Sequence, residues 1–327
     1  MKSISVCMAT YNGEKFIKNQ IETIINQSLK PRQLIISDDS SSDKTVEIIK
    51  RITHEVDFEV KIYINKKSLG VVKNFEKAMS HCNSDIIVLS DQDDLWDSNR
   101  LQHISDMFKE KKIDYYFSDS KVIDSTGKVT KYSLWQRRSF TSKLQNSYNN
   151  SQLPILLKYE NFIYGMTLAF KSKKLDKIIP IESESRLLTH DGWVSMILSG
   201  LNYKGYADNY STTFYRQHGN QVAGPGNISG FLTKMFNSIR NNRLYDKDYP
   251  NDLEKIALKI SNAANPNSKS LKFAGYFKDK ANHLRFRENL MKLSFFTRLK
   301  LIIREVRSGK YKKYSSSKLA FLRDLIG

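Results

Sequence analysis

The sequence predicts an α/β fold built on a mainly parallel sheet, followed by a basic helical segment. Up to about residue 120, short apolar runs alternate with segments in which apolar residues recur at helical spacing. The runs are continuously apolar, which indicates strands that helices cover on both faces of the sheet. After Gly224-Pro225-Gly226 the composition changes to basic and helical patterns. We therefore expect one domain at 1–225 and a basic, mainly helical region at 226–327.

The expected strands and helices alternate from the start of the chain. Strands are expected at the β-rich apolar runs 4–8, 34–37, 60–64 and 86–90. Helices are expected between them, at 16–25, 46–52 and 71–79. From about 124 to 162 the pattern is irregular and polar, so we expect a surface excursion rather than core. Regular apolar patterning returns at 164–170, followed by a helix at 191–198 and extended segments at 203–206 and 212–215. Helical spacing then recurs at 231–239, 253–260 and 290–306.

Most of the positive charge lies in the C-terminal third. The formal net charge is +19, and residues 226–327 contribute +14 of it, from 22 Lys and Arg against 8 Asp and Glu. Such a segment indicates an anionic partner: phospholipid headgroups, a lipid pyrophosphate or nucleic acid. A solvated, lysine-rich face is the alternative that charge alone leaves open.

Cysteine usage and hydropathy indicate a cytoplasmic setting. Cys7 and Cys82 have no CxxC partner or metal-ligand spacing, and free cysteines are most often simply buried. No stretch approaches the roughly 18 to 20 apolar residues that cross a bilayer. The apolar run at 4–9 is too short for a signal peptide. We therefore expect a cytoplasmic chain whose thiols are packed rather than reactive.

An acidic loop follows the most apolar of the expected strands. Asp91-Gln92-Asp93-Asp94 places three carboxylates at a strand end, where ligands of open parallel sheets bind. The carboxylates repel one another unless a cation, hydrogen bonds or water offsets the repulsion. A divalent ion that bridges phosphate oxygens of a ligand would offset it, because Mg²⁺ typically uses one or two carboxylates together with phosphates. The alternative is that Asp94 or Asp97 only caps the following helix.

Several short motifs occur in order between residues 3 and 224. They are Ser5 to Gly13, then Gln27, Asp38-Asp39 with Ser41, Asp43 and Thr45, Gly70 and Asn74, Ser90 to Asp94, Tyr164-Gly165, His190 to Trp193, and Tyr215 to His218. Each motif alone is weak, but their joint order and spacing is specific. Together they resemble the family-2 glycosyltransferases of the GT-A fold. The resemblance implies a Rossmann-like, nucleotide-diphospho-sugar transferase fold and a metal-dependent, inverting glycosyl transfer.

The resemblance implies a donor site in the first half of the chain. Ala9, Thr10 and Tyr11 would lie against the base and ribose of the nucleotide, and the carboxylate of Asp39 would accept a hydrogen bond from the base. Further candidates for donor contact are Glu14, Gln92, Asn74 and, more weakly, Lys73. For Glu14, Asn74 and Lys73, a position on an exposed helix is an equal alternative.

The resemblance also implies a metal site for Mg²⁺ or Mn²⁺. Asp91 and Asp93 match the two acids of the D-x-D motif, in which Asp93 contacts the metal and Asp91 holds ribose or the metal's water shell. Arg216 suits pyrophosphate oxygens, and neutral His218 can ligate a divalent ion. A lone histidine is more often a structural residue, but its place in Tyr-Arg-Gln-His favours metal or donor contact.

Asp191 stands where the family has its catalytic carboxylate. Inverting transfer needs a base on the face opposite the leaving diphosphate, within reach of the acceptor hydroxyl. The family usually has Glu-Asp here, and His190 departs from that pattern as rhamnosyltransferase-like members do. His190, Trp193 and Tyr164 are the acceptor-side candidates. The alternative is that Asp191 only caps its helix.

Two motifs point to a subfamily. Ser90 to Trp96 and Tyr215 to His218 most resemble rhamnosyltransferases of bacterial capsule and cell-surface polysaccharide synthesis. That resemblance implies dTDP-L-rhamnose as donor and a glycan or polyprenyl-pyrophosphate-linked glycan as acceptor. A UDP-hexose or UDP-N-acetylhexosamine donor is the alternative.

Residues 290–306 have the pattern of a basic amphipathic helix. The apolar positions are Leu293, Phe296, Leu299, Ile303 and Val306, and the basic ones are Lys292, Arg298, Lys300, Arg304 and Arg307. Lys310, Lys312 and Lys313 extend the charge, with Tyr311 and Tyr314 as expected interfacial anchors. This pattern predicts peripheral docking on the anionic inner face of the cell membrane. Packing of the same stripe on the catalytic domain, or on a second copy in a homodimer, is an equal alternative.

Other classes of function fit the sequence less well. We expect no nucleic-acid partner, because the basic region lacks a recognisable reading module and the acidic loop would repel phosphate without a metal. A dinucleotide-dependent oxidoreductase would need a GxGxxG turn after the first strand, which the chain lacks. Nucleotidyl transfer is disfavoured by the acceptor-side Asp191.

Overall fold

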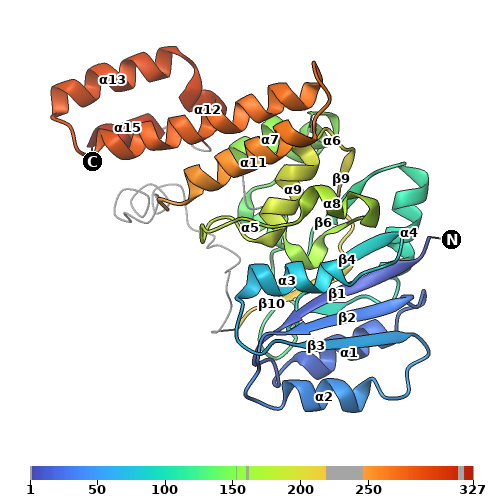
Figure 1. Ribbon diagram of the computed structural model, residues 1–327. Helices are drawn as coiled ribbons and strands as arrows, with labels where there is room; N and C mark the ends of the chain where they lie inside the picture. Colours follow the sequence, from blue (N-terminus) through green and yellow to red (C-terminus); the bar gives the residue numbers. More distant parts are fainter. Residues whose placement is uncertain (1, 152, 160–161, 219–245, 316–319, 327) are drawn as a thin grey trace.

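The computed structural model describes residues 2–151, 153–159, 162–218, 246–315 and 320–326 (Figure 1). The boundary expected near residue 225 and the helical spacing expected at 231–239 lie outside these residues.

A seven-stranded sheet forms the centre of the molecule, in the order β3-β2-β1-β4-β8-β6-β9. Its strands are β1 (Ile4–Thr10), β2 (Gln33–Asp38), β3 (Glu59–Ile64), β4 (Ile86–Ser90), β6 (Tyr115–Ser118), β8 (Ala169–Lys171) and β9 (Gly205–Asp208). Only β8 runs antiparallel to its neighbours. Every residue of β1, β2 and β4 is buried, because helices cover both faces of the sheet. The mainly parallel sheet expected from the continuous apolar runs is confirmed.

Alternate residues of the central strands enter two separate cores. Val6 and Met8 of β1 pack on one face with α1 (Ile17–Ile25), α2 (Thr45–Ile52) and α4 (Arg100–Glu110). Cys7 and Ala9 face the opposite side and pack with α3 (Val71–Ser80) and α9 (His190–Gly200). Cys7 is fully buried, as expected, and Cys82 is partly buried.

The expectation of a surface excursion at 124–162 holds for 124–133, where no residue is buried, and is wrong for the described residues from 134 onward. This stretch contains α5 (Leu134–Arg138), α6 (Ser142–Ser151) and α7 (Leu153–Tyr159). A capping box between Ser133 and Gln136 begins α5. Trp135 is 1% exposed and donates its indole N–H to the carbonyl of Phe162 at 2.8 Å. A few large aromatic side chains bury this stretch, although its polar composition hides the apolar pattern.

A second sheet of three short strands lies beside the first. Its order is β5 (Leu95–Trp96), β10 (Thr213–Arg216) and β7 (Lys121–Ile123). Strand β10 pairs antiparallel with β5, which directly follows the acidic loop, and parallel with β7. The short helices η1 (Gly165–Thr167), η2 (Ser172–Lys174) and α8 (Leu175–Ile178) flank β8 in the chain.

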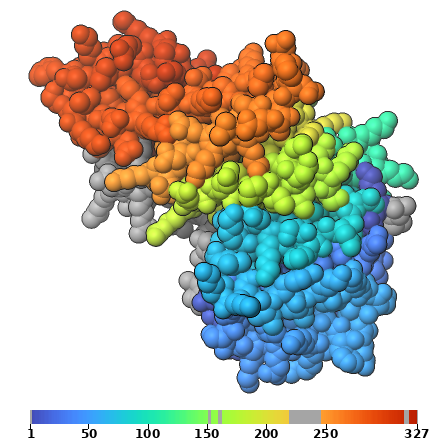
Figure 2. Space-filling view, viewed as in Figure 1, coloured from blue at the N-terminus to red at the C-terminus, as the bar shows by residue number. Residues whose placement is uncertain are grey.

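The C-terminal helices make two different kinds of contact. Helices α11 (Tyr249–Ala263) and α12 (Lys269–Leu290) pack together and contribute to the main core beside α9. Helices α13 (Phe295–Arg307), α14 (Lys310–Tyr314) and α15 (Ala320–Ile326) surround a small core to which the end of α12 contributes Leu290 and Phe286. In Figure 2 these last helices, coloured red, form a lobe away from the blue N-terminal part of the chain. No helix in the described part of the chain is both long and apolar enough to cross a bilayer.

Two tyrosines of α14 are not interfacial anchors, contrary to expectation. Tyr311 is 5% and Tyr314 is 4% exposed. The hydroxyl of Tyr311 donates to Asp324 at 2.8 Å, and Asp324 is also paired with the guanidinium of Arg287. The hydroxyl of Tyr314 donates to Asp279 of α12 at 3.2 Å. Because both hydroxyls have partners within the protein, both rings point inward.

Candidate active site

The carboxyl ends of three parallel strands bring the expected loops to one edge of the sheet. Thr10, at the end of β1, pairs with Asp38, at the end of β2, and β4 ends beside them at Ser90. Asp39 donates its backbone N–H to the carbonyl of Thr10 at 2.8 Å. The loops that follow β1, β2 and β4 therefore lie side by side, where ligands of such sheets bind.

Asp91 stands among acids from separate parts of the chain. Burial, and then the nearby carboxylates of Asp93 and Asp191, raise the pKa of Asp91 to about 8. Asp191 reaches this point from the first turn of α9. The repulsion among the three carboxylates favours a bound cation or a shared proton.

Asp93 and His218 can share a metal ion. Nε2 of His218 lies 2.7 Å from Oδ2 of Asp93, and both side chains are partly buried. Among the described residues, no three His, Cys, Asp or Glu gather into a complete metal site. A carboxylate beside an imidazole still fits Mg²⁺ or Mn²⁺, because such ions complete their shells with substrate phosphates and water.

Arg216, at the end of β10, holds the acidic loop against the small sheet. Its backbone N–H donates to Oδ1 of Asp94 at 3.0 Å, and its Nε donates to the carbonyl of Asp93 at 2.9 Å. The guanidinium lies 5.1 Å from the ring centroid of Phe16, and Arg216 is only 3% exposed. This geometry favours a positioning role over the pyrophosphate contact expected from the sequence. From the sequence, Asp94 was expected as one of three clustered carboxylates or as a helix cap. Its contact with β10 depends on a strand pairing that the sequence does not display.

Asp191 is held firmly at the start of α9. Its Oδ2 accepts the backbone N–H of Gly165 at 2.9 Å, and its Oδ1 accepts the backbone N–H of Gly192 at 2.8 Å. The hydroxyl of Thr189 also donates to Oδ1. These three bonds leave lone-pair capacity on a carboxylate, which has about four acceptor sites. Asp191 can therefore accept a further proton donor.

The three acceptor-side candidates lie in different environments. Trp193 is fully buried and donates its indole N–H to the carbonyl of Ile178 at 2.9 Å, so it is a core residue and the expectation of acceptor contact is wrong. His190 is 5% exposed and stacks on Phe75 with ring centroids 3.8 Å apart. Neither ring nitrogen of His190 has a hydrogen-bond partner among the described residues.

Tyr164 lies beside Asp191 and also contacts a basic residue. Its hydroxyl accepts a 2.7 Å hydrogen bond from Nε of Arg138. Burial raises the pKa of Tyr164, Arg138 lowers it, and Asp191 raises it, with a net increase. Arg138 is exposed and was not among the residues expected from the sequence, because its helix, α5, was not foreseen.

Gln92 fixes the loop after β1. Its amide accepts from the backbone N–H of Tyr11 at 2.9 Å and donates to the carbonyl of Tyr11 at 3.0 Å. The Tyr11 side chain is 54% exposed at this edge, where a nucleobase could stack on it. Gly13 passes so close that a Cβ atom there would lie 2.3 Å from Oε1 of Gln92.

Asp39 is buried and holds the segment that leads into α3. Its carboxylate accepts four hydrogen bonds, from Ser68, Asn65 and the backbone N–H groups of Leu69 and Gly70. Burial alone would raise the pKa of Asp39, but these bonds outweigh it and lower the pKa. Because the acceptor capacity is filled, Asp39 contacts a base only if one of these bonds is given up. The structure favours an indirect role.

The remaining donor candidates hold neighbouring chain segments. Ala9 and Thr10 are buried, and the Thr10 hydroxyl donates to Asp38 at 2.7 Å. The buried Asn74 side chain donates to the carbonyls of Thr10 and Ser37, so it is not an exposed helix residue. Glu14 accepts the backbone N–H of Lys44 at the start of α2. Lys73 is paired with Glu76 on α3.

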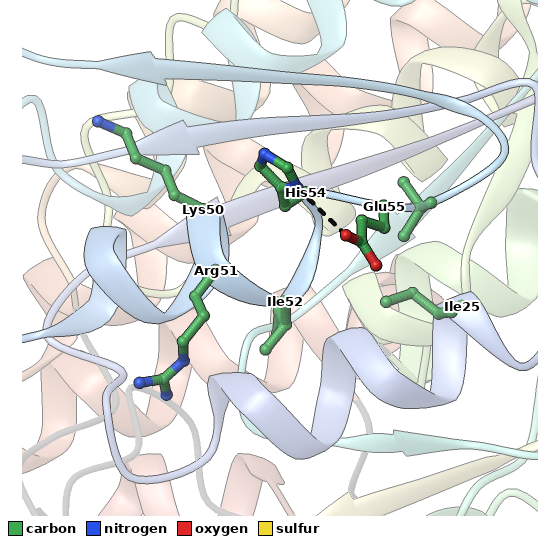
Figure 3. A pocket seen from close by; sticks show the side chains of 7 residues that line it. Ile25, Lys50, Arg51, Ile52, His54 and Glu55 are labelled. Carbon is green, nitrogen blue, oxygen red and sulfur yellow. Dashed lines mark ion pairs between the residues drawn. The ribbon is translucent and has the colours of Figure 1, made fainter.

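One open hollow lies away from this edge of the sheet. It has a volume of about 760 Å³ and is lined by Ile25, Lys50, Arg51, Ile52, His54, Glu55 and Val56 (Figure 3). None of the expected site residues lines it. His54 and Glu55 form an exposed ion pair of 3.9 Å there, which gives no indication of a binding site.

The same arrangement of elements occurs in two solved structures that hold a nucleotide sugar. TarS of S. aureus, solved in complex with UDP-GlcNAc, matches 89% of this chain and 76% of its own, with a TM-score of 0.59 and 16% identity. The mannosyltransferase PcManGT of Pyrobaculum calidifontis, solved with GDP-Man and Mn²⁺, matches 99% of this chain and 86% of its own, with a TM-score of 0.50 and 13% identity. The protein therefore has the GT-A fold.

The chain belongs to the family described as glycosyl transferase family 2, whose model matches residues 5–173. The dTDP-rhamnosyl transferase RfbG of Shigella flexneri is 28% identical over 260 residues, which cover 76% of this chain and 83% of that relative. The glucosyltransferase WfgD of Escherichia coli, which carries the description UDP-Glc:alpha-D-GlcNAc-diphosphoundecaprenol beta-1,3-glucosyltransferase, is 24% identical over 143 residues, covering 44% and 55%. The resemblance inferred from the motifs is confirmed.

Proposed function

We propose that this glycosyltransferase moves a sugar, with inversion, from a nucleoside diphosphate onto an acceptor hydroxyl. The proposal is carried by one observation: Asp91 and Asp93, after β4, and Asp191, on α9, gather at the carboxyl edge of the sheet. The transfer needs carboxylates in two roles. One group faces the diphosphate and its metal ion, and the other acts as a base toward the incoming alcohol.

We assign the base to Asp191. Its three hydrogen bonds orient both carboxylate oxygens while leaving capacity to accept the proton of the acceptor hydroxyl. As the hydroxyl oxygen bonds to the sugar carbon, its proton passes to Asp191 and the bond from the sugar to the diphosphate breaks. The bonds from Thr189, Gly165 and Gly192 would keep the base in place during this step.

Asp93 and His218 would hold Mg²⁺ or Mn²⁺, and Asp91 would hold ribose or the ion's water shell. When bound, such an ion supplies charge stabilisation to the leaving diphosphate. Arg216 and Asp94 would keep Asp93 and His218 together across the two sheets. Tyr11 would stack on the base, with Gln92 fixing its backbone.

For the donor we propose dTDP-L-rhamnose, and for the acceptor a glycan or polyprenyl-pyrophosphate-linked glycan of capsule or cell-surface polysaccharide synthesis. The support is the rhamnosyltransferase relative, which matches most of both chains. A UDP-hexose or UDP-N-acetylhexosamine donor is the second candidate, supported by the glucosyltransferase relative. Release of nucleoside diphosphate from a panel of dTDP- and UDP-sugars, with EDTA and after return of Mn²⁺ or Mg²⁺, would distinguish the donors and test the metal.

The decisive variant is Asp191→Asn. Asparagine keeps the size of the side chain but cannot take a proton, so we expect transfer to fall by roughly 10² to 10⁴ while donor affinity stays within about twofold. Transfer would be followed with soluble glycoside acceptors, and donor affinity by calorimetry. Glu110→Gln, at the far end of α4, is the matched control and should leave both unchanged. Normal transfer by Asp191→Asn would refute the assignment of the base.

A further inference from the structure

Helix α13 turns most of its large apolar side chains outward. Phe295 is 51%, Phe296 81%, Ile303 44% and Val306 40% exposed. The helix instead buries Ile302 and Glu305 against the small core of the lobe. The sequence left open that the apolar stripe packs on the catalytic domain or on a second copy of the chain. The structure does not show the first of these, because most of the stripe is exposed.

The same outer face carries cations. Phe296 and Ile303 are seven residues apart and share one line of the helix, and Lys300 and Arg307 follow each of them by four residues on the adjacent line. Lys300, Arg304 and Arg307 are all exposed. The one acidic residue of α13, Glu305, lies on the inner side, with Oε1 2.9 Å from Nδ1 of the buried His283. The outward face thus combines apolar and positively charged groups without a carboxylate of its own.

Neighbouring elements of the lobe expose further cations and apolar side chains. Lys312 and Lys313 of α14 are exposed, and α15, which packs beside α13, exposes Leu322 at 41% and Ile326 at 68%. In Figure 1, α13 and α15 lie at the end of the molecule farthest from the sheet. A planar surface that approaches this end of the molecule would contact α13 before it contacts the donor-binding loops.

We propose that the outer face of α13 docks on a membrane surface of anionic phospholipid. Phe296 and Ile303 enter the boundary between headgroups and acyl chains, while Lys300, Arg304 and Arg307 bind phosphate groups beside them. A second copy of the chain is a poorer occupant. In a two-fold interface the same cations would face one another, whereas anionic headgroups neutralise them. Membrane docking is independent of the transfer chemistry, and only its purpose, access to a lipid-linked acceptor, rests on the proposed function.

The test is sedimentation of the full chain with vesicles at low salt. Phosphatidylcholine vesicles with about a third phosphatidylglycerol should bind the protein, and pure phosphatidylcholine should bind it far less. Phe296→Ser with Ile303→Ser should weaken binding at least about tenfold. Lys300→Gln with Arg307→Gln should weaken it roughly twentyfold, because each cation near an anionic surface contributes about a fivefold factor.

Matched controls distinguish binding through this face from nonspecific binding of the protein to vesicles. Leu258→Ser removes an apolar group on α11 that is 60% exposed, between the values of Ile303 and Phe296. Lys50→Gln with Arg51→Gln removes two exposed cations on α2. Both controls should bind vesicles normally. The proposal is overturned if the protein ignores phosphatidylglycerol, if the controls lose binding as the α13 variants do, or if sedimentation velocity shows a dimer that the α13 variants break. Nucleoside diphosphate release measured without vesicles reports on the proposed transfer separately.

Discussion

Single residues in this site act mostly by holding other residues. Gln92 was expected to contact the donor, yet its amide bonds both backbone groups of Tyr11. The carboxylate of Asp39 is committed in the same way to the 65–70 segment. Polar side chains at a strand end thus shape the loops that we propose bind the donor, before any ligand is present.

Gly13→Ala tests the contact between the loop and Gln92. The added methyl group would lie 2.3 Å from Oε1 of Gln92, whose flexible end can move away but must then release Tyr11. We expect the thermal unfolding midpoint to equal that of the wild type. Donor affinity should be about tenfold weaker, because the two hydrogen bonds between Gln92 and Tyr11 are lost. Gln92→Ala should have the same effect, and the double variant should be no worse than either single one. Additive losses measured by calorimetry would contradict the shared mechanism.

Asp39→Asn tests the hydrogen bonds to the 65–70 segment through pH. The pKa of Asp39 is lowered in the folded protein, so its stabilising effect is complete above the unfolded pKa of about 3.9 and is lost as pH falls through the folded pKa. The variant should be less stable than the wild type at neutral pH, and the gap should narrow below about pH 4. Denaturant unfolding at a series of pH values measures it. A gap that does not change with pH would show that the carboxylate charge is irrelevant.

At the scale of elements, the small sheet brings together Asp93 and His218, the pair proposed to hold the metal. Strand β10 carries Arg216 and leads to His218, and its pairing with β5 sets both opposite the loop of Asp93. The chemistry of the site therefore depends on the register of a two-residue strand.

Arg216→Lys tests whether this residue positions the loop. Lysine keeps the charge but lacks the fork that reaches the carbonyls of Asp93 and Ser125. We expect the apparent affinity for Mn²⁺, measured by nucleotide binding at increasing metal, to fall about tenfold, with metal-independent binding of the nucleoside unchanged. If metal affinity is normal and only diphosphate-containing ligands bind weakly, Arg216 contacts the pyrophosphate directly.

The elements differ in how well the sequence predicts them. Strands β1, β2 and β4 are continuously apolar because they are buried on both faces, so periodicity reveals them. Strand β5 has two residues and no period, and α5 is fixed by the long-range burial of Trp135. The acids at the strand ends could be predicted from the position rule for parallel sheets. The roles of Gln92 and Asp94 could not, because each bonds a backbone group far away in the chain.

The whole molecule combines a shared core with a satellite lobe. Ile260 of α11 lies so close to α9 that a Cβ atom on Gly200 would be 2.2 Å from its Cδ1. Helix α11 is therefore part of the same body as the helix that begins with Asp191. Ile302 of α13 belongs only to the small core of the lobe.

Ile260→Ala and Ile302→Ala should separate these two bodies. Both variants remove the same buried isoleucine carbons, which should lower the free energy of unfolding by about 2 to 5 kcal/mol. The core around Ile260 is continuous with the sheet. Ile260→Ala should therefore lower the temperature at which half of the donor binding is lost. The Ile302 variant should instead speed hydrogen exchange only in 295–326 and leave donor binding intact, because the lobe opens as its own unit. If Ile302→Ala also speeds exchange in β1 and β4, the lobe and the sheet unfold together, and the donor site depends on α13 for its stability.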